Sequence, residues 1–158
     1  MKKLFLHLFL LAFFVLLLAP TLARAAENPP KFADDTLIIQ TQTHAKEYNI
    51  ELAISETEQQ YGLMYRKELA KNSGMLFIAT PPRAIKMWMK NTLIPLDMLF
   101  VDNSGKIIYI AHHAMPNSLD IINAGEVKSK AVLEIAGGEA EKQNIQIGDK
   151  IIYKAFEK

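Results

Sequence analysis

Residues 98–111 read Met-Leu-Phe-Val-Asp-Asn-Ser-Gly-Lys-Ile-Ile-Tyr-Ile-Ala. Two short apolar runs, Met98–Val101 and Ile107–Ala111, flank the polar tetrapeptide Asp102–Gly105. Apolar runs of this length are typical of strands, and Gly105 suits the left-handed position of a bulged hairpin turn. The stretch therefore predicts a β-hairpin with a strongly apolar first strand.

Other strand-sized runs extend this pattern along the chain, at residues 37–39, 49–54, 75–78, 132–135 and 150–156. Ser55 and Glu58 have the spacing of a capping box, which predicts a helix through about Tyr65. Residues 138–144 could form one or two further helical turns. We expect a mostly β (α+β) fold, namely a single compact antiparallel β-barrel or sandwich with one short helix near residues 56–65.

The N-terminus has the layout of a secretory signal peptide. Two lysines precede an apolar run at residues 4–19, and Ala23-x-Ala25 follows with the small residues that signal peptidases accept. An uncut membrane anchor is the alternative, but the run is shorter than the roughly 20 residues that span a bilayer. We expect cleavage after Ala25, a linker at 26–35, a domain at 36–158, and an exported, periplasmic or extracellular protein.

Composition excludes several classes of protein. The 158 residues contain no cysteine, which excludes a disulfide scaffold and a cysteine-ligated metal site. Removal of residues 1–25 leaves 15 basic and 17 acidic residues. That overall balance favours neither nucleic acid nor anionic lipid as a partner, and it leaves the membrane as a partner only through an uncleaved N-terminal segment.

A set of short motifs resembles one family, the domain of unknown function family 192. The motifs lie at residues 62–66 (GLMYR), 74–77 (GMLF), 87–92 (MWMKNT), 94–102 (IPLDMLFVD) and 132–134 (VLE), with Gly148-Asp149. The resemblance covers the chain from about Thr36 to its end. It implies a compact, mostly β domain that is often exported and has no established reaction.

Trp88 is the first candidate for a functional residue. If residues 85–90 are extended, the indole lies between the ammonium groups of Lys86 and Lys90 on one face. The opposite, apolar face then carries Ile85, Met87 and Met89. Trp88 is either covered by the helix at 55–65 or serves as a stacking platform for a sugar ring or a small organic anion.

Asp97 is the second candidate, because it lies in an apolar run and a buried carboxylate needs donors or a cation. The possible partners are Arg66, Lys90, Asn91 and Thr92. Asp97 could instead accept backbone amides of the turn at 91–95 and brace it. If Arg66 and Asp97 line a cleft beside Trp88, the cleft has the charge and the apolar wall of a ligand pocket.

Methionines raise a further alternative, which is Cu(I) binding through Met87 and Met89 with a histidine on a neighbouring strand. His112 and His113 are adjacent in sequence, so at most one of them could join such a site. Methionine is also a common filler of apolar cores, and we predict no metal site.

We expect this protein to bind a small polar or anionic ligand that is carbohydrate-derived, through Arg66, Trp88, Lys90, Asn91 and Asp97. No catalytic signature or cofactor motif is recognisable in the sequence, which does not favour an enzyme. Two alternatives stay open. One is an envelope hydrolase that uses Asp97 and Arg66, and the other is an interaction module that docks a protein through a Trp88 patch.

Overall fold

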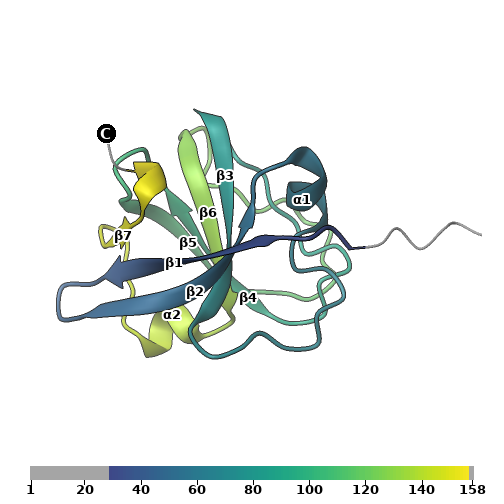
Figure 1. Ribbon diagram of the computed structural model, residues 1–158, viewed down its shortest axis with the longest axis horizontal. Helices are drawn as coiled ribbons and strands as arrows, with labels where there is room; N and C mark the ends of the chain where they lie inside the picture. Colours follow the sequence, from purple (N-terminus) through teal and green to yellow (C-terminus); the bar gives the residue numbers. More distant parts are fainter. Residues whose placement is uncertain (1–28, 157–158) are drawn as a thin grey trace, which may run out of the picture.

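The computed structural model describes residues 29–156, and Figure 1 shows a strongly curled sheet with short helices at its margins. The strands are β1 (Ala33–Gln40), β2 (Ala45–Ala53), β3 (Ser73–Arg83), β4 (Leu96–Val101), β5 (Ile107–Ala114), β6 (Ser129–Ala136) and β7 (Lys150–Ile152). The helices are α1 (Glu56–Tyr61), α2 (Glu139–Lys142) and a final 3-10 turn, η1 (Lys154–Phe156). The mostly β class expected from the sequence is confirmed.

The strands form one sheet in the order β5-β4-β6-β3-β2-β1-β7. All pairs are antiparallel except β2 with β3, which run parallel, so the expectation of a purely antiparallel sheet was wrong at this pair. The two ends of the sheet meet where the Ile107 amide donates to the Asp149 carbonyl at 2.8 Å. A bridge between Lys106 and Lys150 joins the same two ends. The sheet therefore curls round until its first and last strands touch.

The inside of the curl is an apolar core. On β2, Tyr48, Ile50 and Leu52 point inward and are buried, while the residues between them point outward. This period of two is the one that the sequence of residues 49–54 predicts. Inward residues of β1, β4 and β6 complete the core.

A second apolar layer lies on the outside of β3, β6 and β4. Met75, Phe77, Met98 and Phe100 point outward there and are covered by segments that include Leu63. The outer face carries one carboxyl group in this layer, that of Glu134, which lies in register between Met75 and Met98. The protein thus packs both faces of the central strands.

Several local predictions are confirmed and three are corrected. The helix predicted through about Tyr65 ends at Tyr61. The capping box at Ser55 is present, and Gly105 has a φ of 81° in the turn between β4 and β5. The first strand begins at Ala33, inside the stretch expected as a linker. Residues 154–156 form a 3-10 turn rather than the end of a strand.

The expected signal peptide at residues 1–25 lies outside the described residues. Within residues 29–156, no helix has the length and apolar character needed to cross a membrane.

Gly105→Ala is expected to lower the free energy of unfolding by about 2 kcal/mol or more, because a left-handed backbone disfavours a side chain. The added Cβ would also press on the carbonyl oxygen of Ile151 in β7, where the two ends of the sheet meet. Gly125→Ala is the matched control, since its φ is 70° and its Cβ would have open space around it. Urea unfolding of both variants checks this, and equal losses would show that the contact with β7 is not a constraint.

Candidate functional site

Trp88 points away from the apolar layer. Its side chain is 41% exposed, whereas Met87 and Met89 on either side are buried. The ammonium nitrogen of Lys90 lies 5.2 Å from the centre of the indole ring. Residues 85–90 form only an isolated bridge, Met87 to Ile122, yet their sides alternate as the sequence predicts. Trp88 is therefore an exposed residue that α1 does not cover.

A small hollow of about 240 Å³ adjoins Trp88, between α1 and the end of β3. Much of its polar lining is already engaged. The Gln59 side chain donates to the Ile78 carbonyl at 2.8 Å and accepts from Arg83 at 3.3 Å. The hollow thus offers few free hydrogen-bonding groups to a ligand.

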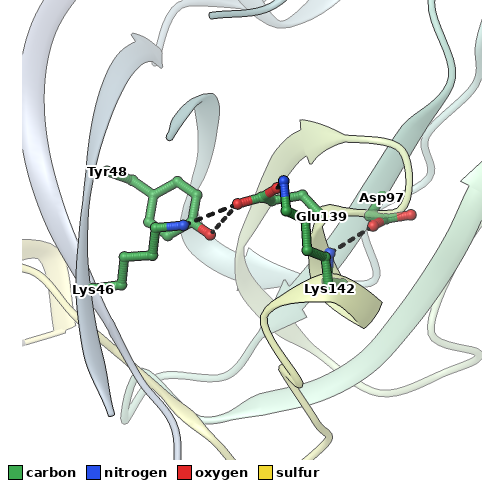
Figure 2. A network of polar contacts seen from close by, with 6 residues as sticks. Lys46, Tyr48, Asp97, Glu139 and Lys142 are labelled. Atoms are coloured by element: carbon green, nitrogen blue, oxygen red, sulfur yellow. Dashed lines mark hydrogen bonds and ion pairs between the residues drawn. The ribbon is translucent and has the colours of Figure 1, made fainter. Parts of the chain in front are cut away.

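Asp97 lies on β4 and points into the core rather than toward Trp88. It is completely buried, and its two carboxylate oxygens accept the amides of His113 at 2.8 Å and Ala140 at 2.9 Å. Figure 2 shows Asp97 beside α2, across from the contacts of Lys46 and Tyr48 with Glu139. Asp97 therefore accepts backbone amides, but those of β5 and α2 rather than of the turn at 91–95.

Arg66 lies on the outside of the sheet and is paired. Its two terminal nitrogens contact the two carboxylate oxygens of Glu51, one of them at 2.9 Å. The guanidinium also lies 5.9 Å from the ring of Phe32. A bidentate pair of this kind holds the guanidinium in one orientation.

Asn91 supports the same region. Its φ is 57°, and its side-chain amide donates to the hydroxyl of Tyr65 at 2.9 Å. Its carbonyl accepts the amide of Tyr65 at 2.8 Å. Asn91 thus fixes the position of the residue that precedes Arg66.

The structure does not gather the five predicted residues around one hollow. Trp88 and Lys90 lie together, Asn91 contacts Tyr65, the neighbour of Arg66 in sequence, and Asp97 is buried in the core. The separation has a physical cause, because strand alternation points Asp97 inward, where only backbone amides can satisfy it.

The residues of the copper alternative are part of the apolar outer layer. Met87 and Met89 are buried with Ile85 there. Within residues 29–156, no group of three or more histidines and carboxylates is arranged to hold a metal ion.

Arg66 belongs to a larger depression, which we call the trough. It consists of two adjoining hollows of about 500 and 470 Å³ that share Asp34, Glu51 and Arg66. The first hollow lies over β1, β2 and the start of β3. The second has an aromatic wall formed by Phe32, Tyr61 and Tyr65.

The floor of the trough is a row of polar side chains across three strands. Thr36 is paired in register with Asn49, and Asn49 with Ser73. In-register residues of neighbouring strands share a face and lie about 5 Å apart. Within residues 29–156, none of these three side chains makes a hydrogen bond to another group. The row thus offers two hydroxyls and an amide to a ligand.

Carboxylates set the charge of the trough. Asp35 is engaged by Lys154 at 2.6 Å, which together with the Thr36 amide and the Tyr153 hydroxyl lowers the pKa of Asp35 to about 2. Arg66 balances Glu51. Asp34 and Glu68 have no ion pair with any residue of the described part of the chain. Lys31 also lines the second hollow and is in none of these ion pairs, so the trough carries a small excess of negative charge.

Sequence reasoning missed Thr36, Asn49 and Ser73. The signal was present for Asn49, since the alternation of residues 49–54 places it on the polar side of its strand. The register that aligns it with Thr36 and Ser73 depends on a parallel pair of strands that the sequence did not reveal.

This chain matches one known protein family over most of its length. The model of the family DUF192, described as "Uncharacterized ACR", matches residues 37–153. No curated protein matches the chain.

Two crystal structures are similar to this chain. One is of a Sinorhizobium meliloti 1021 protein described as a "putative transcription regulator", with 35% identity, a TM-score of 0.75, and coverage of 77% of this chain and 95% of that one. The other is of a protein of unknown function from Novosphingobium aromaticivorans DSM 12444, with 33% identity, a TM-score of 0.74, and coverage of 78% and 94%. On the strength of the family match, this chain is a member of DUF192.

Proposed function

We propose that this protein binds a small polar, carbohydrate-derived ligand in the trough, in the exported compartment that its N-terminal segment predicts. The observation that carries the proposal is the row of unengaged polar side chains formed by Thr36, Asn49 and Ser73 on the trough floor.

The chemistry of the trough suits a polyhydroxylated ring. Hydroxyl and amide groups both donate and accept, so they can pair with sugar hydroxyls in either direction. The aromatic wall offers ring faces against which the C–H face of a sugar can pack. Because the floor belongs to paired strands, the backbone that carries these groups is fixed before the ligand arrives.

The charge of the trough also limits which class of sugar it can bind. Asp34 and Glu68 would repel a carboxylate or phosphate, and Lys31 offsets only one of these two charges because Arg66 is paired with Glu51. A neutral sugar or an amino sugar is therefore favoured over an anionic one.

Asn49→Ala is expected to weaken binding of a glucosamine or N-acetylglucosamine oligomer roughly three- to tenfold, the worth of one hydrogen bond. Isothermal titration calorimetry of the full chain measures the affinity. Glu47→Ala is the matched control, because Glu47 lies on the same face of β2 but outside the trough. Absence of binding to neutral and amino sugars by the unmodified protein would refute the proposal.

The hydrolase alternative finds less support in the geometry. Asp97 is completely buried, and both of its carboxylate oxygens accept backbone amides. Arg66 does not lie beside Asp97 but in the trough. An acid or base must reach the substrate to transfer a proton, so this pair does not form a catalytic arrangement.

A further inference from the structure

Two segments outside the sheet lie side by side near Trp88. The amide of Met87 donates to the carbonyl of Ile122 at 2.8 Å, and the reverse bond measures 2.9 Å. Further along, the amide of Asn117 donates to the carbonyl of Thr92 at 3.0 Å. Residues 87–93 and 115–122 therefore form one continuous, hydrogen-bonded surface.

This surface exposes an unusual number of large apolar side chains, which we call the apolar patch. Its members are 41–71% exposed: Trp88, Leu93, Met115, Leu119 and Ile121. A single exposed apolar residue is ordinary on a soluble protein, but several on adjoining segments indicate an interaction surface.

We infer that the apolar patch docks on an anionic lipid surface. The first reason is the charge around it. Lys86 and Lys90 alternate with Trp88 on the exposed side, Arg83 ends β3 just before them, and Lys128 ends the other connection. The acidic residues nearby are Asp120, Glu126 and Glu56, the last of which lines the hollow beside Trp88. The surroundings thus carry a small excess of positive charge, although the chain from Ala26 onward carries more acidic than basic residues. Lysines beside a bilayer attract anionic headgroups.

The second reason is the kind of side chain and the shape of the surface. Tryptophan is favoured at the membrane interface, where its ring contacts the acyl region and its N–H stays near the headgroups. Among the five members of the patch, Trp88 alone lines one of the three hollows described above. The other four project from their segments, and a bilayer accepts projecting apolar groups without a complementary cavity.

The third reason is the place where the rest of the chain joins the domain. In Figure 1 the described part of the chain begins on the side of the view where the loop that follows β3 and the loop that follows β5 lie. Residues 4–19, which precede this point, form the apolar run behind two lysines. Docking through the patch would hold the domain at the bilayer that this segment meets during export.

Trp88 is the only tryptophan in the chain, so its fluorescence reports on the patch directly. We expect a blue shift, and quenching by brominated acyl chains, when the full chain is mixed with vesicles of phosphatidylcholine and phosphatidylglycerol. Attachment through the N-terminal segment alone would leave Trp88 in water and unquenched. The readout therefore separates patch docking from simple tethering.

Two pairs of matched variants complete the test. The double variant Leu119→Ser, Ile121→Ser should need at least ten times more lipid than the unmodified protein to quench Trp88 by half. Ile147→Ser should leave this lipid concentration unchanged, because Ile147 is similarly exposed, at 62%, but lies in the turn before β7. The double variant Lys86→Gln, Lys90→Gln should lower the affinity for anionic vesicles about fivefold for each lysine removed. The double variant Lys106→Gln, Lys150→Gln should leave this affinity unchanged.

Three outcomes would overturn the inference: Trp88 unquenched by any vesicle, equal quenching in phosphatidylcholine alone, or equal losses in the control variants. Capture of a protein by the patch without lipid binding would also overturn it, in favour of the protein-docking alternative. None of these results depends on whether the trough binds sugar.

Discussion

Glu134→Gln is expected to raise the free energy of unfolding at pH 8 and to remove most of the loss of stability between about pH 4.5 and pH 8. Glu134 lies on β6 in the outer apolar layer, in register with Met75 and Met98. Its side chain is buried and makes no hydrogen bond to another described residue. Burial raises the pKa of Glu134 from 4.5 to about 8.

The direction of this pH dependence follows from the fact that the Glu134 carboxyl binds its proton more tightly in the folded protein than in the unfolded chain. Below pH 4.5 the carboxyl is protonated in both states, and its burial costs little. Between pH 4.5 and 8 the unfolded chain loses the proton while the folded chain keeps it, so the free energy of unfolding falls with rising pH. At about 1.4 kcal/mol per pH unit, the total loss is on the order of 4 kcal/mol.

Urea unfolding at about pH 5 and pH 8 measures this effect. Glu141→Gln is the control, since Glu141 is exposed on α2. A variant at Glu134 that keeps the unmodified protein's dependence on pH would show that this carboxyl is not the group responsible.

Asp97→Ala is expected to lower the free energy of unfolding by about 3–5 kcal/mol. The substitution leaves the amides of His113 and Ala140 without their acceptor, and each unsatisfied buried amide costs about 1–3 kcal/mol. Ala140 is itself completely buried, so water cannot readily replace the carboxylate at its amide.

Asp97→Asn should have a free energy of unfolding between those of the unmodified protein and of Asp97→Ala, because the amide side chain keeps one acceptor oxygen. Asp120→Ala is the control, since Asp120 is exposed in a loop. Chemical denaturation followed by circular dichroism gives the three values. A loss below about 1 kcal/mol for Asp97→Ala would contradict the role assigned to Asp97, which is to fasten β5 and α2 to β4.

Local signals in the sequence predicted the fold well. The capping box at Ser55, the glycine turn at Gly105 and the alternation around Trp88 each depend on neighbours within a few residues, and each is present in the structure. The parallel pairing of β2 with β3 was missed, because no short-range pattern distinguishes it from an antiparallel pair.

The candidate site was harder to predict for the same reason. Whether Asp97 points inward or outward depends on the register of β4 against β6, which only the assembled sheet defines. The trough joins Thr36, Asn49 and Ser73 from three strands, and no motif connects them. Motif reading favoured residues close together in sequence, such as Trp88 and Asn91, which the structure places in different surroundings.

The most direct test of ligand binding in the trough is an NMR titration of the ¹⁵N-labelled chain with a glucosamine oligomer. We predict saturable shifts of the amide signals of Thr36, Asn49 and Ser73, with the side-chain amide of Asn49 shifting most, and no change at the indole N–H of Trp88. Shifts confined to Trp88 and its neighbours, or no shifts with any neutral or amino sugar, would contradict the account.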